Sequence, residues 1–182
     1  MANNESATTN GDGQAAGDEA ARARAMRSKL MAAAFGEIVS VLMRSPHYKH
    51  YSLLDLEWLV VPPLLNNQFS LAEAHNKEGG FAAPVGVALW ASVSEEVDAK
   101  LTQGLDRPIR LRPDEWRSGD ILWMIDAVGA PQTVNALLER LASTVFQNQP
   151  FKVRAVDKDG KRSIKIVQAG EKPEAEEAAD EA

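Results

Sequence analysis

Two tryptophans and two aspartates stand close together in the segment Trp116–Asp126, which reads WRSGDILWMID. Ser118-Gly119-Asp120 has the composition of a turn, and residues 121–125 have the apolar character of a buried strand. Asp126 would then lie where this strand leaves the core, and a carboxylate there is costly unless it has a partner. Burial beside Trp123 would raise its pKa, whereas a cationic neighbour would lower it. Asp126 is therefore either a structural hydrogen-bond acceptor, which the residues alone favour, or a catalytic acid, base or orienting group.

A second group of chemically capable side chains lies in Ser45–Tyr51, which reads SPHYKHY. His47 and His50 are three residues apart, a spacing that could hold a metal ion from one helical face. A proline directly precedes His47 and no third ligand is evident, so the sequence argues against a metal site. Such a corner between two helices can instead present an imidazole to a cleft. The chain contains neither a Walker loop nor a dinucleotide-binding glycine motif.

The elements that must position these residues follow from the apolar pattern. Helical spacing predicts one long amphipathic helix over residues 20–44, ended by Ser45-Pro46. Ser52 and Asp55 resemble a capping box before a second apolar helix, which Pro62-Pro63 would end. The other expected elements are a hairpin of strands 68–75 and 84–90, a short helix from Ser94, a strand over 121–125, a helix over 131–146, and a hairpin of strands 151–156 and 163–167. This order predicts an α+β fold, an α/β sandwich of helices on one central sheet.

Composition limits the class of protein. The chain has 182 residues, of which 45% are hydrophobic, enough for one ordinary core. Of its net charge of −6, residues 1–19 carry −4 and residues 171–182 carry −5, which leaves +3 for residues 20–170. We expect two disordered acidic tails around a single domain over residues 20–170. The absence of Cys excludes a disulfide framework and fits a reducing compartment. Without an apolar span or a secretory signal, the sequence predicts a cytoplasmic protein.

Four segments of the chain, in order, resemble the RTX toxin-activating lysine acyltransferases, the hemolysin-activating proteins that fatty-acylate internal lysines of a protoxin. They are Ser45-Pro46, Val61-Pro62 with Asn67-Gln68-Phe69, Pro84-Val85 leading to Trp90-Ala91, and Trp116-x-Ser118-Gly119-Asp120-x-x-Trp123-x-Ile125-Asp126. The resemblance covers about Phe35 to Gln168. It implies a GNAT-like fold, like that of the Gcn5-related N-acetyltransferases, with a mostly antiparallel sheet. It also implies an acyl chain taken from acyl carrier protein, without a metal or bound organic cofactor, and dependence on one His and one Asp.

The resemblance implies that Asp126 is the catalytic aspartate. The family pattern Ser-Pro-x-His places Tyr48 where the histidine is expected, which indicates altered or lost activity. His47 is then the hypothetical base and His50 the second choice. An imidazole with a pKa of about 6.5 suits the removal of a proton from a lysine whose pKa is about 10.4. Asp126 would orient the imidazole or the ammonium, and Ser118 or nearby backbone amides would bind the thioester oxyanion.

A basic stretch before the motif is a candidate docking patch for the acidic acyl carrier protein. Its members are Arg107, Arg110, Arg112 and Arg117. A solvated loop is an equal alternative, because acidic residues interrupt the stretch. Nucleic acid binding is disfavoured, since no recognition-helix pattern appears and the acidic tails would oppose a polyanion.

Together these features predict a protein-lysine acyltransferase that moves a fatty acyl group from acyl carrier protein to an RTX-type protoxin. The resemblance also suggests a homodimer. The alternative is a catalytically impaired relative that binds the carrier or the toxin as an accessory protein. Tyr48 favours that alternative, whereas Trp123 and Asp126 favour the enzyme.

Overall fold

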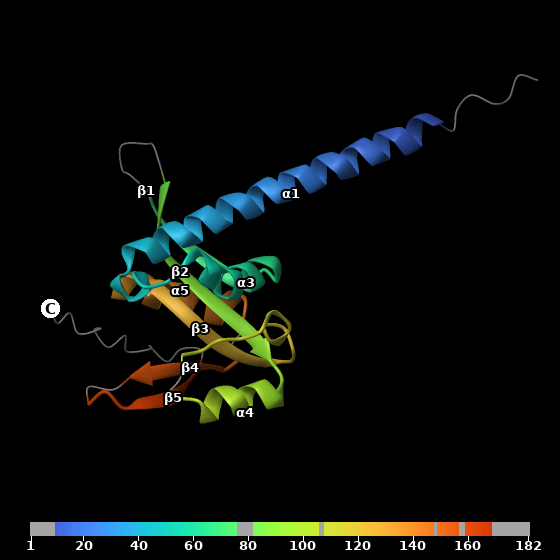
Figure 1. Ribbon diagram of the computed structural model, residues 1–182. Coiled ribbons are helices and arrows are strands. Elements are labelled where there is room, and N and C mark those ends of the chain that lie inside the picture. The colour runs from blue at the N-terminus through green and yellow to red at the C-terminus, as the bar shows by residue number, and fades with distance from the viewer. Residues whose placement is uncertain (1–9, 76–81, 106–107, 148, 157–158, 169–182) are drawn as a thin grey trace, which may run out of the picture. The chain divides into compact units, whose positions relative to one another are not determined.

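The computed structural model of the chain describes residues 10–75, 82–105, 108–147, 149–156 and 159–168 (Figure 1). The chain divides into two compact units, Met1–Ala34 and Phe35–Ala182. Helix α1, Asn10–Arg44, begins ten residues before the predicted start, and the alanines that follow explain this because alanine has the highest helix propensity. The predicted tail over residues 171–182 lies outside the described residues, as do residues 1–9.

Five strands form one sheet in the order β1-β2-β3-β4-β5. Their bounds are Phe69–His75 for β1, Ala82–Val93 for β2, Ile121–Gly129 for β3, Phe151–Val156 for β4 and Arg162–Val167 for β5. All neighbours are antiparallel except β3 and β4, which are parallel. Both predicted hairpins are confirmed, and so is the mostly antiparallel sheet of a GNAT-like α+β fold.

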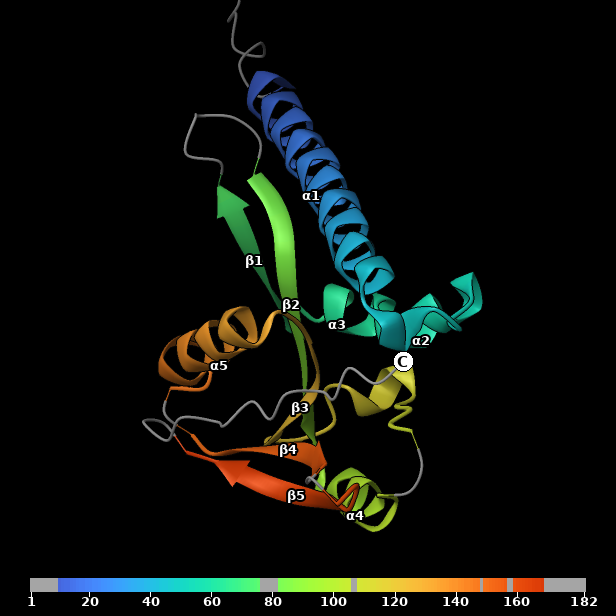
Figure 2. The ribbon, with the colours of Figure 1, turned by 90° about the vertical axis from the view of Figure 1, so that its left-hand side faces the viewer.

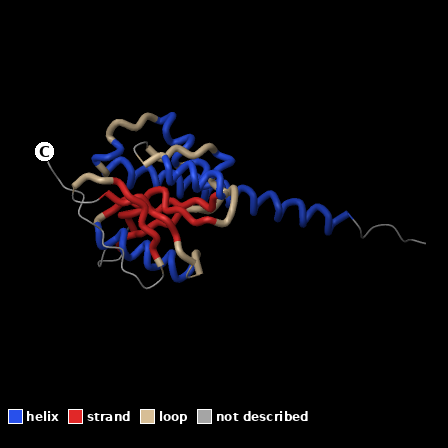
Figure 3. The backbone as a smooth tube through the Cα atoms, turned by 90° about the horizontal axis from the view of Figure 1, so that it is seen from below, coloured by secondary structure: helices blue, strands red, loops and turns tan. Residues whose placement is uncertain are grey.

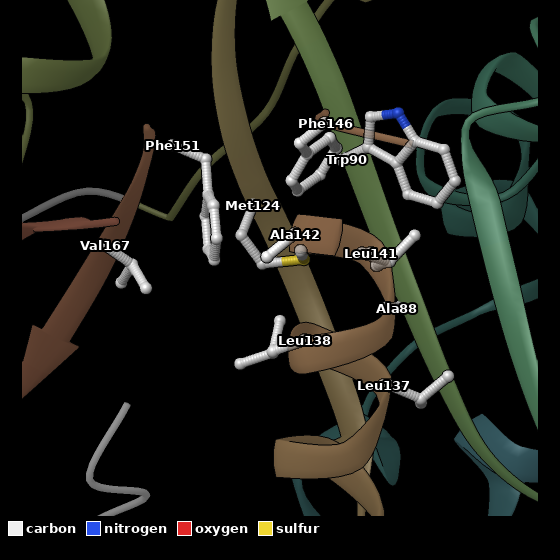
Figure 4. Packing of buried hydrophobic residues seen from close by; sticks show 10 residues of the cluster. All are labelled: Ala88, Trp90, Met124, Leu137, Leu138, Leu141, Ala142, Phe146, Phe151 and Val167. Atoms are coloured by element: carbon white, nitrogen blue, oxygen red, sulfur yellow. The ribbon is translucent and has the colours of Figure 1, made fainter. Parts of the chain in front are cut away.

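The main apolar core lies between the sheet and helix α5, Pro131–Thr144 (Figure 4). The proline stands in the first turn, where its missing N–H costs no helical hydrogen bond. Buried members of the core are Ala88, Trp90, Met124, Leu137, Leu138, Leu141, Ala142, Phe146, Phe151 and Val167. Burying a large apolar side chain contributes about 1.5–3 kcal/mol, so this cluster holds α5 firmly against β2 and β3.

Shorter helices cover the opposite face of the sheet, and Figure 3 shows helical segments on both sides of the strands. Helix α4, Glu95–Gln103, begins at the predicted cap Ser94, whose Oγ accepts a hydrogen bond from the N–H of Val97 at 3.4 Å. The side chain of Trp123 reaches α4 from β3 by donating to Asp98 Oδ1 at 2.7 Å. The predicted sandwich of helices on one sheet is therefore confirmed.

The second predicted helix is divided into shorter pieces. They are the 3₁₀ turn η2, Leu53–Asp55, and the helices α2, Leu56–Leu59, and α3, Val61–Leu65. A further 3₁₀ turn, η1, Pro46–Tyr48, lies before the predicted helix. The capping interaction is present, since the N–H and Oγ of Ser52 both donate to Asp55 Oδ2 at 2.8 Å. The expectation that Pro62-Pro63 would end a helix is wrong, because both prolines lie in the first turn of α3, where proline is tolerated.

Candidate active site

Asp126 follows an irregularity in the pairing of β2 with β3. Leu89 pairs with Asp126 while the next residue, Trp90, pairs with Met124, so Ile125 is an extra residue on β3. Such a β-bulge shifts the alternation of side chains by one position. Leu122, Met124 and Ala127 consequently all pack in the core under α5. In a regular strand, Asp126 would share a face with Met124, two residues earlier, and would point into that core. The bulge instead places Asp126 on the face opposite α5.

The pairing of β3 with β4 ends just before Asp126. The two parallel strands are in register only from Leu122 to Met124, whereas β3 continues to Gly129. Figure 2 shows β4 and β5 running at a steep angle to β1 and β2. Asp126 therefore lies on the part of β3 that continues beyond its pairing with β4.

The point at which the strands part is held by a partly buried ion pair. Lys152 on β4 stands opposite Trp123 on β3, and its ammonium lies 5.8 Å from the centre of the Trp123 ring. The same ammonium is 2.7 Å and 2.8 Å from the two carboxylate oxygens of Asp98. Asp98 also accepts the indole N–H of Trp123. These contacts tie β3, β4 and α4 together beside the bulge, a role for Trp123 that its sequence position did not predict.

The carboxylate of Asp126 has a side-chain partner in Tyr48. The Tyr48 hydroxyl, from η1, donates a hydrogen bond to Asp126 Oδ2. Tyr48 is 8% exposed, and Asp126 is partly buried. Burial raises the pKa of Asp126 from its ordinary value of 3.8 to about 7, against a backbone hydrogen bond from Ala127 that lowers it. The carboxyl group therefore changes charge close to neutral pH, which is the range in which a general base works best.

An aromatic row extends from this contact to the surface. It consists of His47, Tyr48, Tyr51 and Trp58, with successive ring centroids 5.2 Å, 4.9 Å and 6.3 Å apart. The guanidinium of Arg110 lies 5.3 Å from the Trp58 ring centre, within the range of a cation–π interaction. The aromatic row thus connects Asp126 with one of the predicted docking arginines, and only the frequency of aromatic residues over 48–58 could have suggested it.

The predicted histidines do not contact Asp126. His47 and His50 are both exposed, and the His47 ring meets the edge of Tyr48. In the part of the chain that the structure describes, no hydrogen bond joins either imidazole to the carboxylate, and no group of three or more His, Asp or Glu side chains is placed to hold a metal ion. The structure thus brings Tyr48 to Asp126, and the assignment of His47 as base stays a prediction.

The predicted arginines have different surroundings. Arg107 lies outside the described residues, whereas Arg110, Arg112 and Arg117 are exposed. Arg112 is 3.3 Å from the carboxylate of Asp114 and 3.4 Å from that of Glu115. These acidic neighbours offset the charge of Arg112, so Arg110 and Arg117 are the stronger candidates for contact with an acidic partner.

The turn of the motif has a structural role. The backbone N–H groups of Ser118 and Gly119 both donate to the carbonyl oxygen of Ser92, at 2.9 Å and 3.1 Å. The Ser118 hydroxyl donates to the carbonyl of Glu115 at 3.0 Å and accepts from the N–H of Ser94 at 2.9 Å. All these groups have partners within the protein. Ser118 and the Gly119 N–H are therefore occupied within the protein, and oxyanion binding by other backbone amides near the turn stays a prediction.

Comparison with known proteins identifies the class to which this fold and site belong. The model of the RTX toxin acyltransferase family matches residues 28–169. An uncharacterized protein of Synechocystis sp. is 24% identical over 133 residues, which are 72% of this chain and 84% of that protein. The RTX-I toxin-activating lysine-acyltransferase of Actinobacillus pleuropneumoniae is 32% identical over 126 residues, covering 69% of this chain and 67% of the relative. A leukotoxin-activating lysine-acyltransferase of a Pasteurella haemolytica-like species is 31% identical over 110 residues, covering 60% of this chain and 61% of the relative.

The match to the family model covers most of the chain and includes both Tyr48 and Asp126. The protein belongs to the RTX toxin acyltransferase family. Among its described residues no helix combines the length and apolar character needed to cross a membrane.

Proposed function

We propose that this protein is a protein-lysine N-acyltransferase that takes a fatty acyl group from acyl carrier protein and transfers it to internal lysines of an RTX-type protoxin. Support comes from its family and from relatives whose names describe toxin-activating lysine acyltransferases. The observation that carries the proposal is the position of Asp126, a carboxylate placed beside the parting strands and held by Tyr48.

Acyl transfer to lysine needs a proton acceptor. An ammonium with a pKa of about 10.4 is almost fully protonated at neutral pH and has no lone pair with which to attack a thioester. A positioned base contributes roughly a hundredfold to ten-thousandfold to such a step. The candidates are His47, predicted from the sequence, and Asp126, whose pKa of about 7 suits the task. No metal or bound organic cofactor is required by this chemistry.

The carrier protein would dock beside the aromatic row. Arg110 is exposed at its outer end, and Arg117 is exposed on the turn before β3. Guanidinium groups form charge-assisted hydrogen bonds with phosphate and carboxylate groups, which an acidic carrier with a phosphopantetheine arm would offer. Docking here would bring the thioester toward Asp126. The homodimer suggested by the resemblance is compatible with a carrier protein docked at this position.

Intact-mass measurement tests the proposal directly. An RTX-repeat protein is incubated with acylated carrier protein and the wild-type protein, and we expect a fatty acyl mass on a lysine. Asp126→Ala should abolish this gain, whereas Asp120→Asn, in the same motif but exposed, should retain it. Single His47→Ala and His50→Ala variants test the sequence-based assignment of the base.

An accessory role is the second candidate, and the Tyr48–Asp126 contact favours it, because a phenol rather than an imidazole fills the position next to the carboxylate. Under this alternative the protein binds acylated carrier but transfers nothing. Carrier binding measured by calorimetry, combined with no mass gain for the wild-type protein, would support the accessory role and contradict acyl transfer.

A further inference from the structure

We propose that Asp126 itself is the general base of this protein, and that Tyr48 is the positioning residue that orients its carboxylate and stabilises its ionised form. This inference rests on the proposed acyl transfer. It assigns to Asp126 the role that the sequence suggested for His47, and it gives the tyrosine at the family's histidine position a defined task.

Tyr48 is placed by a tightly bonded corner. The N–H of Ser45 donates to the carbonyl of Leu42 at 3.0 Å, the N–H of Tyr48 donates to Ser45 at 3.2 Å, and the N–H of Tyr51 donates to Tyr48 at 3.0 Å. The Tyr48 ring is packed between the rings of His47 and Tyr51. Since Tyr48 is 8% exposed and its ring contacts two neighbouring rings, its hydroxyl has little freedom to leave the carboxylate.

Among the described residues, Tyr48 is the side chain that forms a hydrogen bond with Asp126. The ionisable side chains that contact the Tyr48 ring are His47, in the same 3₁₀ turn, and Tyr51, in the turn that follows. The Arg44 guanidinium donates to the carbonyl of Pro84 on β2. No ion pair involves Asp126 in the part of the chain that the structure describes. The charge of the carboxylate is therefore stabilised by the Tyr48 hydroxyl and the Ala127 N–H rather than by a cation.

The proposed step transfers the acyl group from the thioester sulfur to the lysine nitrogen. One proton of the lysine ammonium passes to the Asp126 carboxylate, and the amine lone pair forms an N–C bond with the carbonyl carbon of the acyl thioester. The C–S bond breaks, and its electron pair leaves with the sulfur. The thiolate takes the second proton of the amine, and Asp126 later releases its proton to water. Tyr48 keeps its own proton throughout, so it acts through Asp126 and not on the substrate.

A hydroxyl that donates to a carboxylate favours the charged form and lowers its pKa. Removing that donor should therefore raise the pKa of Asp126 relative to that of the wild-type protein. The loss of a hydrogen bond to a charged group shifts the pKa of that group by roughly one to two units. Such a shift distinguishes a positioning role from simple packing.

The test is a pH titration of the carboxyl carbon of Asp126 by ¹³C NMR on the full chain. The resonance is assigned by its absence in Asp126→Asn. We expect Tyr48→Phe to raise the midpoint by about one unit or more, and Tyr48→His, which restores an N–H donor, to return it to within half a unit of the wild-type value. Tyr51→Phe is the matched control, since Tyr51 contacts the Tyr48 ring but has no bond to Asp126. Equal midpoints in Tyr48→Phe and Tyr51→Phe would overturn the inference.

The titration does not depend on activity, so it separates failure of this inference from failure of the proposed function. Absence of acyl transfer by the wild-type protein would contradict the proposed function, while the midpoint in Tyr48→Phe would still decide whether Tyr48 controls Asp126. Where transfer is observed, the lower limb of its pH profile should move upward in Tyr48→Phe by the same amount as the midpoint. A profile that does not move would overturn the role of Tyr48 in the reaction.

Discussion

At the scale of single residues, Asp126 has the two properties that its sequence position suggested as alternatives. It accepts a hydrogen bond from Tyr48, and burial raises its pKa to about 7. A structural acceptor and a base near neutral pH are therefore compatible in one carboxyl group. The local sequence indicated burial next to an apolar strand, but it could not identify Tyr48 as the partner, because the two residues are 78 positions apart.

The raised pKa of Asp126 predicts a pH-dependent cost in stability. The carboxyl group is neutral in both states below the unfolded pKa of 3.8, so it contributes no penalty there. As pH rises toward the folded pKa of about 7, the unfolded state loses its proton first, and the native state becomes less stable by at most about 4 kcal/mol. Asp126→Asn should therefore be more stable than the wild-type protein at pH 8, with little difference at pH 4. Urea unfolding at both pH values measures this, and an equal difference at the two values would contradict it.

At the scale of elements, apolar periodicity predicted the helices and hairpins well, because each buries one face. The bulge on β3 could not be predicted, because residues 121–128 are apolar except for Asp126. Such a run has no alternation of polar and apolar residues whose interruption would indicate an extra residue. The division of the second helix was also missed. There, two adjacent prolines could either end one helix or begin another, and only tertiary packing decides between them.

The turn before β3 depends on Gly119 for lack of space. A Cβ at this position would lie 2.6 Å from the carbonyl oxygen of Val93 and 2.7 Å from Ser94 Cα. Because both neighbours are backbone atoms, we expect Gly119→Ala to lower the free energy of unfolding by about 3 kcal/mol or more. Gly36→Ala is the matched control, since nothing lies within 4 Å of a Cβ there and alanine favours the helix. Chemical denaturation of both variants checks this, and a loss below about 1 kcal/mol for Gly119→Ala would show that the turn relaxes.

At the scale of the whole molecule, the two units of the chain predict different tolerance to truncation. Residues 18–30 of α1 are exposed, whereas Ile38, Val41 and Leu42 are at most 3% exposed and belong to the larger unit. Removing residues 1–34 should therefore change the free energy of unfolding by about 1 kcal/mol or less. Removing residues 1–44 should cost several kcal/mol, because each large buried side chain contributes about 1.5–3 kcal/mol. Equal losses in the two truncations would contradict this division of the chain.

The resemblance noted from the sequence led to the correct family and fold, because the motif residues form hydrogen bonds that connect the sheet to its neighbouring elements. Trp123 binds Asp98, and the Ser118-Gly119 turn binds Ser92, so their spacing records structural requirements of the fold. The roles of the site residues were harder to assign, since they depend on which side chains from distant parts of the chain contact each other. The Tyr48–Asp126 hydrogen bond is one such contact, and only the three-dimensional structure could identify it.

The pH dependence of lysine acylation tests the central claim, that Asp126 accepts the proton from the lysine, most directly. Initial rates are measured between pH 5 and pH 9 with wild-type protein and Asp126→Asn, using acylated carrier protein and an RTX-repeat acceptor. We predict that the wild-type rate rises with pH and levels off above the Asp126 pKa of about 7, and that Asp126→Asn is slower by roughly a hundredfold to ten-thousandfold. A wild-type rate that keeps rising to pH 9, as expected if only the free amine reacts, or an Asp126→Asn rate equal to that of the wild type, would contradict it.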